Sequence, residues 1–306
     1  MTSINESVWL QGERHTVVAR QHGDYPPLLQ EIAKPPHLLY VDGEPATLTL
    51  PAIAIVGSRN PTRAGEQNAF AIARKLAAAG FCIASGLAQG IDAAAHRGAL
   101  DAGGTTVAFL GHGIDRLYPA RNRQLAQEIS ASGALVSEFP VGMPPNRAAF
   151  PQRNRLIAGI ALGTLVVEAA RSSGSLITAR FAGDQGREVF ALPGSIHNPL
   201  TRGCHELIRQ GAKLVETAAD IVSEVAPLTG CLVQIAVEST SKASNIKSLD
   251  NEYVQLKNRI GHDPITVDEL ARNCGLTIEK VSSMLLLLEL HGEVESLSGG
   301  RYSALS

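Results

Sequence analysis

The sequence predicts an α/β fold, in which a doubly wound parallel sheet is followed by a small C-terminal winged-helix domain. Between residues 51 and 222, short apolar runs alternate with stretches of helical periodicity, as in parallel sheets with right-handed crossovers. Residues 251–306 instead suggest three helices and a β-ribbon. A chain of 306 residues with 44% hydrophobic content is long enough for two such domains.

The parallel sheet is predicted to begin with the apolar run 52–56, AIAIV. Asn60 and Pro61 are then expected as the N-cap and first residue of a helix. Apolar residues at helical spacing should bury one side of that helix: Phe70, Ala73, Leu76 and Ala77. Further strands are expected at 81–84, 105–110, 134–136, 164–167, 188–192 and 213–215, and further helices at 91–100, at 123–130, from 153 and after 175.

The flanking regions define the predicted domains. Residues 1–50 are expected to be a short segment packed on the core, with a short helix and a small strand within 21–45. Residues 51–225 form the sheet domain, and the polar stretch 226–250 is a linker. In the last domain, 251–306, helices are expected at 252–260, 266–273 and 277–290, and a ribbon at 293–304 with Gly299-Gly300 at its tip.

Composition indicates a cytoplasmic protein. No secretory leader and no run long enough to span a bilayer is visible. The cysteines are scattered (Cys82, Cys204, Cys231 and Cys274), which is typical of a reducing compartment and provides no metal-ligand spacing with the histidines. We therefore expect neither a metal nor a cofactor.

Charge is distributed unevenly along the chain. The net charge is −2, but residues 51–222 carry 17 Lys and Arg against 12 Asp and Glu, and all but two of those cations are arginines. Because the guanidinium fork matches phosphate geometry, this bias favours a phosphate-bearing partner for the middle of the chain.

Three predicted strand ends are followed by loops of one chemical type: Gly57-Ser58-Arg59, Ser85-Gly86, and Ser172-Ser173-Gly174-Ser175. Any one of them alone is ordinary turn chemistry. Together at one edge of a sheet, with arginines nearby, they indicate an anion site built from backbone N–H groups and helix N-termini. Neither a Walker A sequence nor G-x-G-x-x-G is present, which disfavours a standard NTPase or dinucleotide site.

The triplet Arg153-Asn154-Arg155 stands at a predicted helix start. It has two interpretations: a clamp for backbone phosphates, or structural ion pairs with Glu168 or Glu138. Phe150, three residues earlier, is either a ring that stacks on a base or a core phenylalanine.

Asp92 and His96 are four residues apart and should share one helix face. Acid–base catalysis is conceivable, but a hydrogen-bonded pair that holds loops in place is the favoured interpretation. Glu168, at the end of a strand, is expected to have a similar orienting role.

A series of motifs in fixed order resembles the DprA/Smf family of DNA-processing proteins. The resemblance covers roughly residues 21–222 and is carried by these stretches: IVGSR (55–59), SGLAQGIDAAAH (85–96), GHGIDRLYPARN (111–122), SEFPVGMPP (137–145), FPQRNRLIAG (150–159), VVEAARSSGSLITA (166–179) and LPGS (192–195). The C-terminal domain resembles the winged helix of many members. Two departures are a very short N-terminal region, and Gly203-Cys204-His205 where many members have Gly-Thr-Asn.

The resemblance implies an extended Rossmann-like sheet and a non-catalytic function. Members of the family bind single-stranded DNA, usually as homodimers, protect incoming strands and help load RecA recombinase in natural transformation. By motif, Gly57, Ser58 and Arg59 would form one wall of a phosphate pocket, and the triplet from Arg153 to Arg155 another. The remaining expected DNA-binding residues are Ser85, Gly86, Phe150, Ser173, Gly174 and Ser175.

Two other functions stay open. A nucleotide-binding enzyme of the phosphoribohydrolase type would share the sheet but carries a PGG-x-GT-x-x-E run, whereas Pro193-Gly194 is followed here by Ser195-Ile196. A transcriptional regulator would read DNA with the helix at 277–290. That helix has one lysine and four consecutive leucines in an acidic domain, which favours a protein-interaction or regulatory module.

Overall fold

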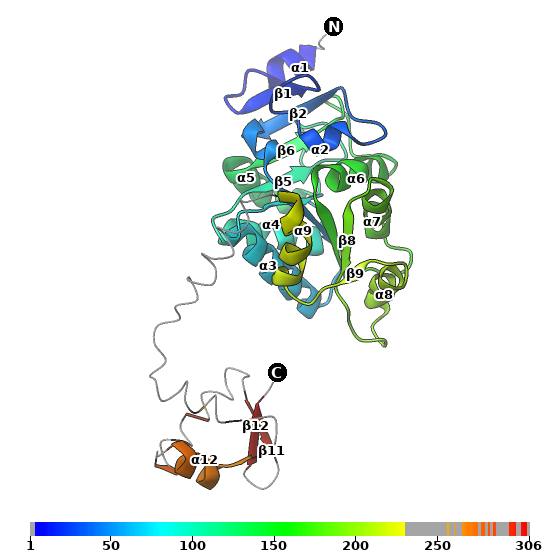
Figure 1. The fold of residues 1–306 in the computed structure, drawn as a ribbon. Coiled ribbons are helices and arrows are strands. Elements are labelled where there is room, and N and C mark those ends of the chain that lie inside the picture. The colour runs from blue at the N-terminus through cyan, green and yellow to red at the C-terminus, as the bar shows by residue number, and fades with distance from the viewer. Residues whose placement is uncertain are drawn as a thin grey trace. The chain divides into compact units, whose positions relative to one another are not determined.

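The computed structural model describes residues 4–229 and, further along the chain, residues 256, 260, 265–274, 277, 278, 281, 284, 285, 294–297 and 301–304. The chain divides into two compact units, Met1–Thr240 and Ser241–Ser306 (Figure 1). The first unit contains the large sheet and all the loops singled out above.

A nine-stranded, mostly parallel sheet forms the first unit, in the order β1-β2-β6-β5-β4-β3-β7-β8-β9. Strands β3 to β9 run parallel to one another. Their bounds are β3 (Ala52–Gly57), β4 (Cys82–Ser85), β5 (Thr106–Phe109), β6 (Ala134–Ser137), β7 (Gly163–Val167), β8 (Glu188–Ala191) and β9 (Lys213–Leu214). The predicted α/β fold is confirmed.

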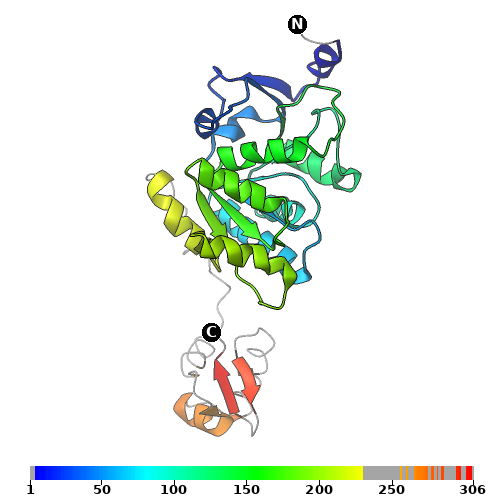
Figure 2. The ribbon, with the colours of Figure 1, turned by 90° about the vertical axis from the view of Figure 1, so that its right-hand side faces the viewer.

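Helices cover both faces of this sheet. On one face lie α3 (Arg63–Ala78), α4 (Ile91–Asp101), α5 (Arg123–Ser132) and α9 (Ala218–Thr229), and on the other α6 (Ala149–Ile160), α7 (Ser175–Asp184) and α8 (Arg202–Arg209). Helices α6 and α7 lie side by side (Figure 2).

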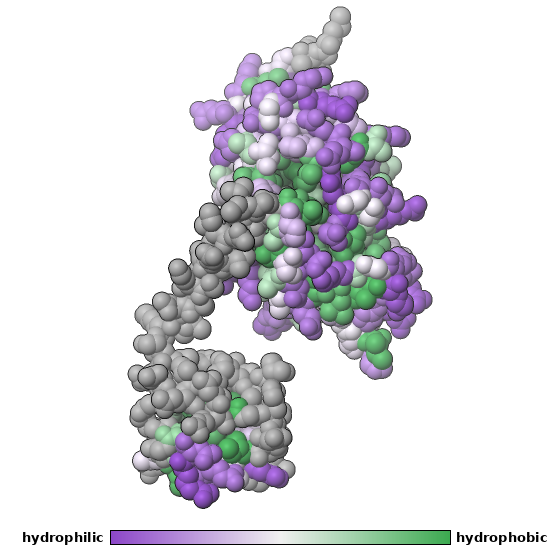
Figure 3. Space-filling view, in the orientation of Figure 1, coloured by the Kyte–Doolittle hydropathy of each residue, from purple (hydrophilic) through white to green (hydrophobic). Residues whose placement is uncertain are grey.

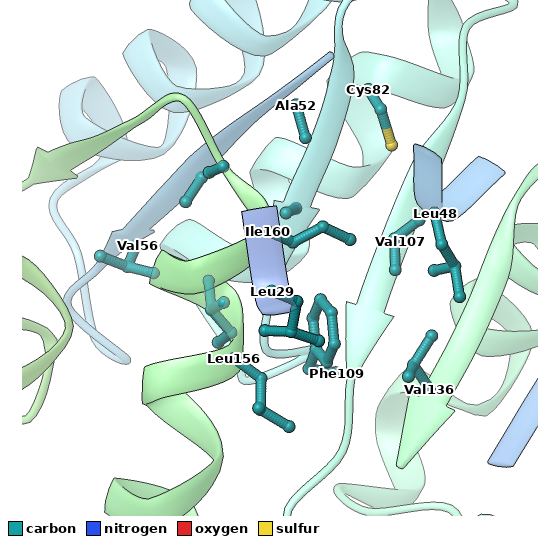
Figure 4. Packing of buried hydrophobic residues seen from close by; sticks show 14 of the residues in the cluster. Leu29, Leu48, Ala52, Val56, Cys82, Val107, Phe109, Val136, Leu156 and Ile160 are labelled. Atoms are coloured by element: carbon teal, nitrogen blue, oxygen red, sulfur yellow. The ribbon is translucent and has the colours of Figure 1, made fainter. Parts of the chain in front are cut away.

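Side chains of β3 alternate between the two helical layers, as the pleat of a strand requires. Ile53 and Ile55 belong to the buried cluster of α3, α4 and α9. Ala52 and Val56 point the other way, toward residues of α6 such as Leu156 (Figure 4). Both faces of the strand are buried, which explains why it reads as a continuous apolar run.

Strand β3 is where the winding of the sheet reverses. It lies between β4 and β7, so the chain leaves β3 on one side and returns on the other after α6. In open parallel sheets, ligands bind beyond the carboxyl ends of the strands at this switch point. The loops that follow β3 and β7 therefore define the first place to look for a site.

The N-terminal segment extends the sheet rather than only packing on it. Strands β1 (His15–Ala19) and β2 (Leu38–Gly43) are antiparallel and continue the sheet beyond β6. The segment also contains α1 (Ile4–Trp9), α2 (Pro27–Gln30) and a 3₁₀ turn, Pro45–Thr49. The small strand and short helix of 21–45 are present, whereas β1 was not predicted.

Two helix starts differ from the prediction. Thr62, not Asn60, is the N-cap of α3, since its Oγ1 accepts the Gly65 N–H at 3.0 Å. Helix α6 begins at Ala149, so the Arg-Asn-Arg triplet lies inside it. Pro151 falls in the first turn of α6, where its missing N–H breaks no helical bond.

Smaller differences concern burial and an added helix. Phe70 is only partly buried on α3, while Ala73, Leu76 and Ala77 are buried as expected. Helix α8 was not predicted, and α9 extends to Thr229, beyond the expected start of the linker at 226.

The second unit contains a three-stranded antiparallel sheet in the order β10-β12-β11 and a helix, α12 (Val267–Cys274). Its strands are β10 (Ile265–Thr266), β11 (Val294–Leu297) and β12 (Arg301–Ala304). The helix expected at 266–273 and the ribbon are present. The predicted helices at 252–260 and 277–290 lie largely outside the described residues, as do the linker 230–250 and the Gly299-Gly300 tip.

Polar side chains cover most of the face that Figure 3 shows, with apolar residues exposed between them. Within the part of the chain that the structure describes, no helix has the length and apolar character needed to cross a membrane.

Candidate functional site

A hollow of about 670 Å³ opens at the switch point of the sheet. Its walls come from the loops after β3 and β7, from α6 and from two loops next to β5 and β6. The lining residues used below are Ser58, Arg59, Tyr118, Arg147, Phe150, Arg153, Asn154, Ser173, Gly174 and Ser175. The structure therefore brings together two of the three predicted loops and two polar residues of α6, Arg153 and Asn154.

The loop after β3 forms the first wall. Gly57 has no room for a side chain, because a Cβ there would lie 1.9 Å from the Val167 carbonyl oxygen of β7. This close approach of two backbones fixes the direction of the loop. Ser58 is buried, and its Oγ accepts the Asn60 N–H at 3.1 Å. Arg59 is exposed, and no carboxylate among the described residues pairs with it.

The loop after β7 forms the second wall and leads into the N-terminus of α7. The hydroxyls of Ser173 and Ser175 are 2.6 Å apart, and Asn154 Nδ2 donates to the Gly174 carbonyl at 3.3 Å. Helix α7 presents its first turn to the hollow here. Such an end favours an anion through its unpaired N–H groups and its dipole.

Two aromatic rings lie beside these walls. Phe150 is partly buried, and its ring centroid lies 5.6 Å from the Arg59 guanidinium carbon. Tyr118 is 51% exposed and lies 6.0 Å from Phe150, centroid to centroid. Phe150 lines the hollow and is only partly buried, and its stacking on a base stays a prediction. Tyr118 was missed, although the sequence RLYPARN places it beside a proline turn and arginines.

Arg147 is a second lining residue of the hollow that was not predicted from the sequence. It is exposed, lines the hollow and has no carboxylate partner among the described residues. Its signal in the sequence was weak, because it stands in an irregular stretch, PPNRAA, just before α6.

Arg153 lies beneath the hollow rather than at its rim. Only 4% of the residue is exposed, and its Nη1 donates to the carbonyls of Gly86 at 2.7 Å and Phe109 at 2.5 Å. Burial lowers the pKa of Arg153 to about 10; nearby Asp92 opposes this shift and Arg59 adds to it. The side chain therefore stays cationic at neutral pH.

Arg155 points away from the hollow. Its Nη2 forms an ion pair with Glu138, and its Nη1 donates to the Lys34 carbonyl. Burial raises the pKa of Glu138, and Arg155 opposes that shift. Of the two interpretations of this arginine, the structure shows the ion pair with Glu138, and the bond to the Lys34 carbonyl connects α6 to the N-terminal segment.

Ser85 and Gly86 shape the floor of the site. Ser85 is fully buried, and its Oγ donates to the Ile55 carbonyl at 2.6 Å. A Cβ at Gly86 would lie 2.3 Å from Arg153 Nη1. This loop therefore does not form a third wall, contrary to the pattern of three equivalent anion-binding loops.

Asp92 and His96 hold different partners and not each other. Asp92 Oδ2 accepts the N–H groups of Gly86 at 3.2 Å and Ala88 at 3.3 Å, and burial raises its pKa. His96 Nδ1 is 2.7 Å from Thr106 Oγ1, which donates to the Ile83 carbonyl, so Nδ1 carries the proton. Asp92 therefore bonds the loop after β4, whereas His96 bonds a residue of β5, and the expected pairing of the two is absent.

The burial of His96 predicts a loss of stability in mild acid. Burial lowers its pKa to about 3, against about 6.5 for an unfolded histidine. The unfolded chain therefore binds the extra proton first, and the free energy of unfolding should fall by about 1.4 kcal/mol per pH unit below pH 6.5. Urea unfolding of the wild type and His96→Gln from pH 7.5 to 4.5 checks this. If the difference between the two proteins is independent of pH, the prediction is wrong.

Glu168 links three loops behind the hollow. Its carboxylate accepts the Thr62 N–H at 2.7 Å, the Thr62 hydroxyl at 2.6 Å and the Asn198 amide at 3.3 Å. Its backbone is left-handed, with a φ of 51°. The orienting role expected for this residue has a geometric basis. Within the described part of the chain, no group of three or more His, Cys, Asp or Glu is placed to hold a metal ion.

Comparison with known proteins identifies the family. Residues 16–226 match the profile of DNA recombination-mediator protein A, and residues 240–300 match the DprA winged helix domain. Protein Smf of Escherichia coli is 40% identical over 300 residues, which cover 97% of this chain and 80% of the relative. DNA processing protein DprA of Streptococcus pneumoniae is 44% identical over 200 residues, or 65% of this chain and 71% of the relative.

Two solved structures agree with this assignment. The crystal structure of the Streptococcus pneumoniae protein superimposes with a TM-score of 0.68 at 40% identity, covering 73% of this chain and 78% of that one. A Helicobacter pylori DNA processing protein A, whose structure describes a single-stranded DNA binding mode, gives 0.63 at 28% identity, covering 70% and 96%. The chain therefore belongs to the DprA/Smf family of DNA recombination-mediator proteins.

Proposed function

We propose that this protein binds single-stranded DNA in the hollow at the switch point, as a non-catalytic mediator in the cytoplasm. It would protect incoming strands during natural transformation and help load a RecA recombinase, acting as a homodimer. The family assignment and the single-stranded DNA binding mode described for the Helicobacter pylori relative support this proposal.

The observation that carries the proposal is the pairing of an exposed cation with an exposed aromatic surface. Arg59 lies 5.6 Å from the Phe150 ring, which is followed by Tyr118 at 6.0 Å. A strand of DNA repeats a phosphate and a base, so a site that binds it combines cations with stacking rings. A site for phosphate alone would not need the rings.

The proposed contacts divide by chemistry. Arg59 and Arg147 would hold phosphates, and Phe150 and Tyr118 would stack on bases. Ser58, Gly57 and Asn154, together with Ser173, Gly174 and Ser175 at the start of α7, would supply backbone and side-chain hydrogen bonds. Asp92, His96 and Glu168 would orient these loops, since their polar atoms already bond to the protein.

The second unit would serve as a regulatory or protein-interaction module, joined to the first by a polar linker. The part of α12 that faces solvent begins with two acidic residues, Asp268 and Glu269. Negative charge disfavours contact with a DNA backbone.

Fluorescence anisotropy of labelled oligo-dT and of a matched duplex, each titrated at two salt concentrations, tests the function. We expect tight binding of the single strand, weaker binding of the duplex, and a logarithmic salt slope of about −0.7 for each phosphate contacted. A flat salt response or a preference for duplex would contradict the proposal. Turnover of nucleoside monophosphates would instead favour a nucleotide-hydrolysing enzyme.

A further inference from the structure

We propose that Arg153 is a positioning residue, which holds the Phe150 ring and two strand ends in place and does not itself contact the bound strand. The inference rests on the proposed function, because it concerns how the same hollow binds DNA. It also separates two arginines of one motif, Arg153 and Arg155, from the arginines that would meet phosphate.

The Nη1 group of Arg153 is directed at protein carbonyls, and its Nε is buried without a hydrogen-bond partner among the described residues. Nη1 is shared between the carbonyl of Gly86, just after β4, and that of Phe109, the last residue of β5. With 4% of the residue exposed, a phosphate could reach this group only by displacing these carbonyls from a buried cation. Leaving such carbonyls unpaired is costly. The exposed Arg59 and Arg147 have no such hydrogen bonds to carbonyls among the described residues.

Arg153 instead supports the ring that faces the hollow. Phe150 precedes it by three residues on α6, so both project from one side of the helix. The Arg153 guanidinium carbon lies 6.0 Å from the ring centroid, within the range of a cation–π contact. Arg59 meets the same ring at 5.6 Å. The ring therefore contacts one buried cation and one exposed cation.

Two glycines explain how the pair is accommodated. A Cβ at Gly86 would be 2.3 Å from Arg153 Nη1, and a Cβ at Gly111 would be 2.6 Å from Phe150 Cδ1. Neither glycine has a positive φ, so backbone conformation does not require them. The space beside Arg153 and Phe150 does. The glycine of the Ser85-Gly86 loop is therefore needed for the guanidinium and not for a phosphate.

The carboxylate of Asp92 compensates the positive charge of Arg153 within the protein. Asp92 lies on the same buried side and lines the floor, and its carboxylate raises the pKa of Arg153 against the effect of burial. The arginine adds positive potential below the hollow without donating a hydrogen bond to the ligand. The position of the Phe150 ring depends on the geometry of Arg153 more than on the charge of Arg153.

Oligo-dT that contains one 2-aminopurine distinguishes positioning from contact. The fluorescence of the 2-aminopurine at saturation reports stacking, and the salt dependence of the binding constant reports phosphate contacts. The full chain would be compared with Arg153→Lys, Gly86→Ala and Gly111→Ala. Arg147→Ala is the phosphate-contact reference. The control is Arg74→Ala, which replaces an exposed arginine of α3 that pairs with Asp101 of α4. Thermal unfolding verifies that each variant is folded.

Positioning predicts that all three variants bind about 5- to 100-fold more weakly, as for the loss of one stacked base. Their salt slopes should equal that of the wild type, and their 2-aminopurine quenching at saturation should be reduced. Arg147→Ala should keep the quenching and lower the slope by about 0.7. If Arg153→Lys does not fold, the two glycine variants carry the test, since each displaces a side chain and keeps every charge.

Wild-type affinity in Arg153→Lys would show that the geometry of Arg153 is not needed, and full quenching with a lower salt slope in Gly86→Ala would show that Arg153 contacts phosphate. Either result would overturn the inference. The proposed function would survive that result. If the wild type itself fails to bind oligo-dT, the proposed function is wrong and the inference falls with it.

Discussion

Replacing both exposed arginines of the hollow, in Arg59→Ala/Arg147→Ala, is expected to weaken binding of oligo-dT by about 100- to 10,000-fold. Each side chain is exposed, lines the hollow and lacks a carboxylate partner among the described residues, so its donors are available to the ligand. A hydrogen bond to a charged group contributes about 1.5–3 kcal/mol, or roughly 10- to 100-fold in affinity. The salt slope should also fall by about 1.4, the value for two phosphates.

The matched control replaces two arginines that are equally exposed but lie outside the hollow. Arg74 pairs with Asp101 on the α3–α4 face, and Arg180 pairs with Asp184 on α7. The variant Arg74→Ala/Arg180→Ala makes the same change in net charge, so it corrects for non-specific attraction. Equal losses in both double variants would mean that the hollow has no special role. A normal affinity in the first would place the DNA elsewhere.

The sequence was sufficient to predict the sheet and the position of the site. Buried parallel strands are uniform apolar runs, and the loops after β3 and β7 carry Gly57 and Gly174 in small-residue turns. Two of those loops do meet at the switch point. These features depend on local pattern and on topology rules that hold for the whole fold class.

The sequence was not sufficient to assign individual arginines. Arg153 and Arg155 differ by two positions on α6, and that spacing turns them to different sides of a helix. One enters the floor of the hollow and the other reaches Glu138. The spacing separates the two side chains, but it does not say which of them faces the hollow.

Tyr118 and Arg147 were missed for a related reason. Both lie in irregular loops, where no periodicity reports which way a side chain faces. Strand β1 was missed because its sequence, HTVVA, is short and only partly buried. Its pairing with β2 is a long-range contact that local pattern does not encode.

Glu168 combines an unfavourable backbone conformation with favourable hydrogen bonds of its carboxylate. A left-handed backbone at a residue other than glycine costs about 1–2 kcal/mol, and Glu168 has a φ of 51°. The cost is offset by a carboxylate that caps α3 through Thr62 and reaches the β8–α8 loop through Asn198. Gly65 makes room for it, since a Cβ there would lie 2.4 Å from Glu168 Cδ.

The variant Glu168→Ala is accordingly expected to lose about 3–5 kcal/mol of the free energy of unfolding. It removes the acceptor of two short bonds and a longer one, and it leaves the partners of a 7%-exposed residue unsatisfied. It also retains the left-handed backbone without the carboxylate that compensates for it. Urea unfolding at pH 7 measures the loss.

Glu168→Gly separates the two contributions. It deletes the same carboxylate but tolerates the positive φ, so it should be more stable than Glu168→Ala by about 1 kcal/mol, the cost of left-handed backbone. Both variants should also bind oligo-dT more weakly with an unchanged salt slope, because Glu168 fixes the loops of the hollow and does not line it. An alanine variant as stable as the wild type would mean that Thr62 and Asn198 hold these loops without the carboxylate.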